Sequence, residues 1–286
     1  MSADGDHHYI PQFHLQKWEN ATKEVTVWRR IDHTGKLFVE RKTTAAVAYV
    51  PGLYAMQQVP SERSQVIENS VFANAVETNA APILGKLIAG RLGSLSEEEK
   101  GWWAVYLNSS LLRLPHSVKR FRNSAKEHAA ASFADGQQEY EAIRGNSPES
   151  TLYEWVESHH PNVLANIHLE IMVKMLAKPE IIDRMMSLTW IVFDLSRASR
   201  TLLLGDHPLL SVSALFSPAA FIALPLSPTR LFVATDDESA IRRVTEMPPR
   251  ELVSLANMVT LRNVRQFIFG DAERSFLDKH FPRTLP

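Results

Sequence analysis

Four polar residues that are far apart in the chain have side chains suited to hydrolytic chemistry. His8 lies near the start of the chain, and Glu68 lies in a helical segment. Asp206 and His207 are adjacent and follow an apolar segment. Imidazole and carboxylate groups bind Mg²⁺, Mn²⁺ or Zn²⁺, and the bound ion activates water for attack on a phosphodiester bond. We therefore predict a divalent-metal site formed by these four residues, with His8, Glu68 and Asp206 as the catalytic groups of a nuclease-like hydrolase.

Three further polar residues are candidates for substrate binding. Gln12 lies in an apolar stretch at the start of the chain, residues 7–18, which we call the opening stretch. Asn79 lies in the same helical segment as Glu68, and Arg113 lies at the end of a helix that is apolar nearly all round. A guanidinium group forms paired hydrogen bonds with phosphate or carboxylate groups. We predict that Arg113 binds the phosphate of the substrate, and that Gln12 and Asn79 bind beside it.

The position of Glu68 on its helix is the observation behind these assignments. At 100° per residue, the apolar side chains of residues 62–90 fall on one face, and Glu68 lies in the middle of that face. Glu77 points directly away from it and is predicted to be solvated. A buried carboxylate is destabilising by several kcal/mol unless it is paired, protonated or metal-bound. Glu68 therefore requires a partner, which is either the metal ion or Arg113 in a structural ion pair.

Several of these residues also have a structural interpretation. His8 is either a ligand or general base, or a histidine that hydrogen-bonds to a backbone carbonyl. Asp206 either forms part of a site at a strand end or closes an ordinary Asx turn. We expect His7 to be solvated and His14 to lie at the surface or at an edge.

Two functions other than hydrolysis remain open. In a non-catalytic ligand-binding or sensor module, the same residues would line a buried polar pocket for an anion or a peptide, with Arg113 as the anchor. In a purely structural arrangement, they would form a polar network that fixes the opening stretch on the helices. The expected partners are accordingly nucleic acid or a small anionic ligand, and the oligomeric state stays open.

Composition and motifs exclude several other functions. The 286 residues include 31 Lys and Arg against 32 Asp and Glu, a formal net charge of −1, so the chain has no overall basic field. Cysteine is absent, which excludes thiol nucleophiles, iron–sulfur clusters and disulfides. The chain has no GxGxxG, GxxxxGK[ST], HExxH or GxSxG motif. Since no apolar run is long enough to span a membrane, we expect a soluble cytoplasmic protein.

The elements that must position these residues indicate an α+β fold with a central helical block. We predict one domain over residues 1–286, with a β-rich segment at 1–60, helices over 61–187, and a β-rich segment with C-terminal helices over 188–286. Alternating apolar residues predict a β-hairpin over 25–42, with its loop at 32–35. Four apolar runs predict antiparallel strands at 188–195, 200–205, 221–226 and 230–235, the first two forming a hairpin.

Separated stretches of the chain resemble a bacterial family known as domain of unknown function 4238. The features are an HYVPQFYL-type opening, a Glu-containing helix, an Arg-x-Pro, and an Asp-x-Pro before a PLSP-like strand. The matching residues are His8, Tyr9, Pro11, Gln12, Phe13 and Leu15; Glu68 and Glu77; Arg113 and Pro115; and Asp206, Pro208, Leu226, Ser227 and Pro228. His14 stands where the family has an aromatic residue, and His207 where Asn is common. The resemblance implies no particular activity.

Overall fold

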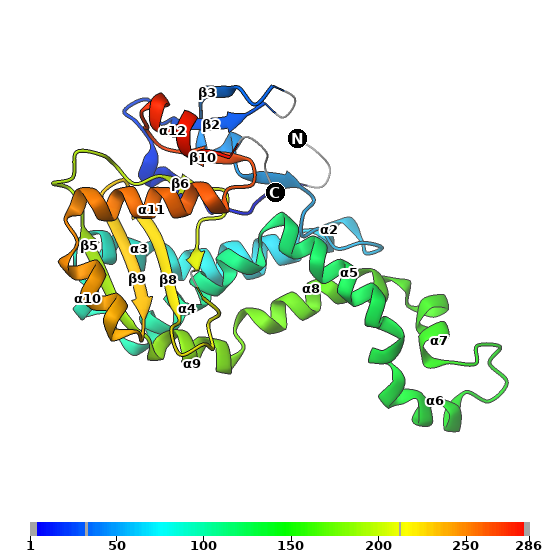
Figure 1. The fold of residues 1–286 in the computed structure, drawn as a ribbon. Coiled ribbons are helices and arrows are strands. Elements are labelled where there is room, and N and C mark those ends of the chain that lie inside the picture. The colour runs from blue at the N-terminus through cyan, green and yellow to red at the C-terminus, as the bar shows by residue number, and fades with distance from the viewer. Residues whose placement is uncertain (1–4, 32–33, 212, 283–286) are drawn as a thin grey trace. The chain divides into compact units, whose positions relative to one another are not determined.

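Helices occupy the middle of the chain and antiparallel strands both ends (Figure 1), which confirms the predicted α+β class. The computed structural model describes residues 5–31, 34–211 and 213–282. The chain forms two compact units, each assembled from separate stretches. The first unit comprises Met1–His7, Val50–Ala75 and Leu112–Ala177, and the second comprises His8–Tyr49, Val76–Leu111 and Lys178–Pro286. One folding domain over residues 1–286 stays a prediction.

The first unit is mainly helical. Its elements are α2 (Ser61–Ser64), α5 (Pro115–Ser132), η5 (Ala134–Gly136), α6 (Gln137–Ile143), α7 (Leu152–His159) and α8 (Pro161–Leu176). α5 packs along α8, and η5, α6 and α7 connect the end of α5 to the start of α8 (Figure 1). Thr151 caps α7 in a reciprocal arrangement with Glu154, and Pro161 opens α8, so local sequence signals set both starts.

Four elements contain a boundary between the two units. They are β1 (Asp6–His8), β4 (Tyr49–Pro51), which pairs with β1, the π-helix η3 (Ile67–Glu77) and α4 (Glu97–Leu112). In each of these four elements, a single strand or helix contributes residues to both units.

The second unit combines short helices, two sheets and longer covering helices. Its helical elements are α1 (Gln12–Leu15), η1 (Gln16–Trp18), η2 (Thr44–Ala46), α3 (Thr78–Ile88), η4 (Leu92–Ser94), α9 (Pro179–Ser187), α10 (Glu238–Glu246), α11 (Pro249–Asn263) and α12 (Arg274–His280). Its strands are β2 (Val25–Arg30), β3 (Leu37–Lys42), β5 (Thr189–Asp194), β6 (Leu204–Gly205), β7 (Leu210–Ser211), β8 (Phe221–Ser227), β9 (Arg230–Thr235) and β10 (Phe267–Phe269).

The larger sheet has the antiparallel order β5-β9-β8-β7, and helices cover both of its faces (Figure 1). Successive residues of a strand point to opposite faces. Leu231 and Val233 of β9 accordingly pack with residues of α10 and α11, whereas the Phe232 ring lies 5.9 Å from that of Trp103 in α4. The two-sided covering explains why the strands read as nearly continuous apolar runs in the sequence.

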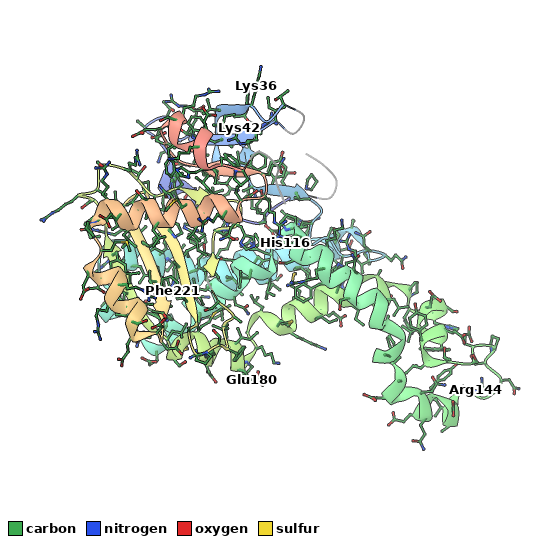
Figure 2. All side chains as sticks on the ribbon, in the orientation of Figure 1. Lys36, Lys42, His116, Arg144, Glu180 and Phe221 are labelled. Carbon is green, nitrogen blue, oxygen red and sulfur yellow. The ribbon has the colours of Figure 1, made fainter. Side chains whose placement is uncertain are left out.

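The smaller sheet has the order β3-β2-β10-β6 and confirms the predicted hairpin. β2 pairs with β3 in antiparallel register from Val25↔Lys42 to Arg30↔Leu37. Figure 2 shows Lys36 and Lys42 on this hairpin. Of the predicted loop, residues 32–33 lie outside the described residues.

The predicted hairpin between segments 188–195 and 200–205 is wrong. β5 pairs with β9 along its whole length, and β6 pairs with β10 in the other sheet. The Leu202 N–H donates to the Pro228 carbonyl (2.8 Å), so the chain leaves the larger sheet beside the β8–β9 turn. Both segments have the same local apolar pattern, and the distant partner decides which sheet each one joins.

The helix predicted over residues 62–90, with a bend expected at Pro82, is divided into α2, η3 and α3, and Pro82 lies inside α3. In the π-helix η3 each hydrogen bond spans five residues, so each residue advances by less than 100°. The buried side chains are accordingly spaced by five and then by four, at Ile67, Phe72, Val76 and Ala80. Within the described ranges, no helix is long and apolar enough to cross a membrane.

Candidate functional site

In the first unit, Arg113 lies in a buried stack of aromatic rings. The Arg113 side chain is 0% exposed, and its guanidinium carbon lies 4.6 Å from the centre of the Phe72 ring. The Phe72 ring lies 4.8 Å from that of Tyr54, whose hydroxyl donates to the Arg113 carbonyl. A cation over an aromatic face is stabilised electrostatically, more strongly when water is excluded. Arg113 therefore has a structural role in this unit, whatever else it binds.

His7 extends the same stack and is buried, so the prediction that it is solvated is wrong. Its ring lies parallel to that of Tyr54 at 5.3 Å. The Tyr54 N–H donates to Nδ1 of His7 (2.8 Å), and Nε2 bonds to Oε1 of Gln65. Because an N–H donates into Nδ1, the proton of neutral His7 is on Nε2. The imidazole fixes the loop that contains Tyr54.

Glu68 and Glu77 differ less in burial than the helical geometry predicts. Both side chains are partly buried in η3, so Glu77 is less exposed than predicted, and the Oε2 atom of Glu68 is shielded from solvent. The assumed 100° per residue explains the difference at Glu77, the last residue of η3, because a π-helix turns more slowly. Pairing of Glu68 with Arg113, which lies in the same unit, stays a prediction.

In the second unit, His14 is completely buried, so the prediction of a surface or edge position is wrong. Its Nε2–H donates to the Pro225 carbonyl of β8 (2.8 Å), and Nδ1 accepts from the Tyr106 hydroxyl of α4 (2.8 Å). Burial lowers the pKa of His14 to about 4, while the Pro225 carbonyl acts in the opposite direction. His14 is therefore neutral near pH 7 and joins the opening stretch to the larger sheet.

Asp206 binds backbone amides in the second unit. Its two carboxylate oxygens accept from the N–H groups of Arg265 (2.8 Å), Gln266 (2.5 Å) and Phe267 (3.0 Å), between α11 and β10. Burial raises the pKa of Asp206 to about 6, and the three amides act in the opposite direction. These bonds give Asp206 a structural role that differs from the predicted Asx turn, because its partners lie in a distant segment rather than in its own turn.

The remaining predicted residues all belong to the second unit. His8 is buried, with its ring 5.7 Å from that of Tyr49. Gln12 begins α1, Asn79 lies in α3, and His207 follows Asp206; each of these three is partly buried.

The predicted site residues are thus distributed over both units, with Glu68 and Arg113 in the first and the other five in the second. Among the residues that the structure describes, no three His, Asp or Glu side chains form a group that could hold a metal ion. The four-residue metal site and the catalytic roles stay predictions.

The first unit contains a cavity that the sequence did not indicate. It has a volume of about 420 Å³ and is lined by Gln57, Gln58, Arg122, Ala125, Leu164, Ala165 and His168. The residues at its mouth, Gln57, Gln58 and Arg122, are exposed. Leu164 and Ala165 are partly buried, and Ala125 and His168, at its inner end, are buried. Cavities of this size hold small organic ligands.

Asn166 holds the loop at the mouth of this cavity. Its Oδ1 accepts from the Gln57 N–H (2.7 Å), and its Nδ2 donates to the carbonyls of Gln57 (2.8 Å) and Asn162 (2.7 Å). The next residue, Gln58, has φ of 55°, a left-handed conformation that is unfavourable for a residue with a side chain. Two hydrogen bonds from a buried side chain thus hold Gln57, next to the strained residue Gln58, and strained backbone of this kind is found at binding sites.

Comparison with known proteins gives a family and no activity. The family model described as Protein of unknown function (DUF4238) matches residues 6–274. The chain belongs to the DUF4238 family. No curated protein and no solved structure matches it.

In this member of the DUF4238 family, two of the family-like stretches meet in the second unit. His14 of the opening stretch bonds to Pro225, which is adjacent to the Leu226–Pro228 segment. Trp18, at the end of the opening stretch, donates its Nε1–H to the Leu202 carbonyl (3.1 Å), four residues before Asp206. These two side chain to carbonyl bonds join the opening stretch to distant segments, although His14 itself departs from the family pattern.

Sequence reasoning missed His7, His14 and Asn166. For the two histidines the available signal was the apolar bulk around them, which favours burial over solvation. Asn166 lies within a helical segment with apolar neighbours, and a carboxamide in such a position needs internal partners. Its partner loop is more than 100 residues earlier, so nothing local could identify it.

Proposed function

We propose that this DUF4238 protein is a non-catalytic ligand-recognition protein whose binding site is the cavity between α5, α8 and the Gln57–Gln58 loop. The observation that carries the proposal is the strained loop, held by Asn166 at the mouth of a cavity of about 420 Å³. Side-chain hydrogen bonds that hold polar groups at a rim reduce the ordering entropy lost when a ligand binds.

The cavity also has the composition of a recognition site. Three small or apolar side chains, those of Ala125, Leu164 and Ala165, provide surface for a ligand body. The carboxamides of Gln57 and Gln58 and the Arg122 guanidinium offer hydrogen bonds at the mouth. Such an arrangement provides affinity from apolar burial and specificity from a few polar groups.

The alternative is the metal-dependent phosphodiesterase predicted from His8, Glu68, Asp206 and His207. What weakens it is the geometry around Asp206, whose carboxylate oxygens already accept three backbone N–H groups. A carboxylate in that environment would have to give up these bonds to coordinate a metal ion fully.

Thermal unfolding of the protein against a panel of small molecules tests the proposal. The panel contains nucleotides, nucleosides, sugar phosphates, carboxylic acids and amino acids. A ligand at one hundred times its Kd stabilises the folded state by about 2.7 kcal/mol, which raises Tm by several degrees. Ala165→Trp fills the cavity and should abolish the shift, whereas Ala131→Trp, on an exposed part of α5, should retain it.

The same measurement with Mn²⁺, Mg²⁺ or Zn²⁺ separates the two functions. A metal-induced rise in Tm that Glu68→Gln removes, together with cleavage of DNA or RNA, would support the phosphodiesterase and overturn ligand recognition as the primary function. A panel shift that depends on Ala165, without turnover, supports recognition.

A further inference from the structure

An exposed arginine lies at the mouth of the α5–α8 cavity. Arg122 is the cation among the seven residues that line it, and no carboxylate lines it within the described part of the chain. α5 adds Lys119 and Arg120, both exposed, and its sequence from Pro115 to Ala125 contains no acidic residue. Lys119 lies three residues before Arg122 and therefore on the same face of α5, so these two positive charges raise the local concentration of anions at the cavity mouth.

The shape and polarity of the cavity restrict the organic part of the ligand. Ala125 and Leu164 present small apolar surface from α5 and α8, and Ala165 adjoins them on α8. This apolar surface suits a ring of an organic ligand. At the rim, the carboxamide of Gln58 offers one acceptor and two donors, which match the hydrogen-bonding edge of a heteroaromatic base.

From these features we propose that the ligand is a nucleoside monophosphate, with its phosphate on Arg122 and its base against Ala125, Leu164 and Ala165. Arginine is suited to this contact because its N–H groups bond to two phosphate oxygens at once. This inference rests on the proposed recognition function and adds the class of ligand to it.

Isothermal titration of the full chain with AMP, GMP, CMP and UMP tests the inference, with the four matching nucleosides and inorganic phosphate as partial ligands. At least one monophosphate should bind more tightly than its own nucleoside or than phosphate. Arg122→Gln should lower the affinity for that monophosphate by about tenfold or more, because a charge-assisted contact is lost. The affinity for the nucleoside should not change. Arg122 is exposed, so the variant should fold as the wild type does.

Arg120→Gln is the matched control. Arg120 is also an exposed arginine of α5 but does not line the cavity, so its loss should change monophosphate affinity by no more than about threefold, through long-range charge alone. Equal losses for Arg120→Gln and Arg122→Gln would overturn the assignment of the phosphate to Arg122.

The outcomes separate this inference from the proposed function. If no monophosphate binds, while another panel compound raises Tm in an Ala165-dependent manner, the ligand class is wrong and recognition at the cavity stands. If monophosphates bind but Ala165→Trp does not change their affinity, the assignment of the binding site to the α5–α8 cavity is wrong. If nothing in the panel binds, both proposals fail.

Discussion

At the scale of single residues, titratable side chains in this protein are bonded to backbone groups far away in the sequence. His14 and Pro225 are 211 positions apart, and Asp206 bonds to residues that follow it by about sixty positions. A buried polar group is costly unless it is hydrogen-bonded, and here backbone carbonyls and amides satisfy these groups. Histidine and aspartate can therefore occur in apolar stretches without forming a catalytic site.

Acidification should destabilise the protein through His14. In the unfolded chain the imidazole binds a proton below about pH 6.5, whereas in the folded protein burial lowers its pKa to about 4. The unfolded state therefore binds more protons between these values, and the free energy of unfolding falls as pH falls through this window. A shift of this size corresponds to a loss on the order of 3 kcal/mol.

Urea denaturation of wild type and His14→Gln from pH 7.5 to 4 measures this effect. The advantage of the wild type should shrink toward low pH, because glutamine does not titrate. The comparison is necessary because Asp206, with its pKa raised to about 6, changes the free energy of unfolding with pH in the opposite direction. The stability that Asp206 contributes is present at low pH and is lost as pH rises through that value. A pH-independent difference between the two proteins would contradict the role of His14.

Asp206→Asn should destabilise the protein at pH 7 by about 1–3 kcal/mol for each backbone N–H that loses its acceptor. The carboxamide has one oxygen in place of two, and its NH₂ group faces donors. Asp271→Asn is the control, because Asp271 is exposed and accepts from the Thr26 hydroxyl at the surface. Chemical denaturation compares the two variants, and equal effects would show that the amides do not depend on Asp206.

At the scale of elements, the π-helix η3 departs from the helical geometry assumed from the sequence, and the strained Gln57–Gln58 loop is a feature that the sequence did not indicate. The apolar pattern of residues 62–90 is compatible with a regular α-helix, yet buried residues in η3 are five apart at one step. A change in helix type moves the following side chains around the axis by an amount that accumulates, so the helical geometry misplaced Glu77, at the end of η3. The strained loop depends in turn on one residue of α8.

Asn166→Ala should loosen this loop and weaken ligand binding at the cavity. It removes an acceptor from the Gln57 N–H and donors from two carbonyls, so Gln58 can relax from its left-handed conformation. Hydrogen exchange should become faster at the Gln57 amide. Asn162→Ala is the control, because Asn162 contributes its backbone carbonyl, which the substitution retains. Unchanged exchange at Gln57 in Asn166→Ala would show that the loop is held by other contacts.

At the scale of the whole molecule, the chain passes repeatedly between two units, and the candidate residues divide with it. A contact between residues distant in sequence costs chain entropy before it contributes stability, so such an architecture depends on strong long-range pairing. Antiparallel sheets and buried side chain to backbone bonds provide that pairing within the second unit.

The sequence by itself determined the α+β class, the β2–β3 hairpin, strands β8 and β9, and membership of the DUF4238 family. These features follow from local alternation, turn residues and motif order, which are readable along the chain. Only the tertiary structure decided that β5 joins β9, that His7 and His14 are buried, that Asp206 binds three amides, and that Asn166 holds a loop beside a cavity. The physical reason is that hydrogen-bond partners far apart in the sequence leave no local periodicity, because only folding brings them together.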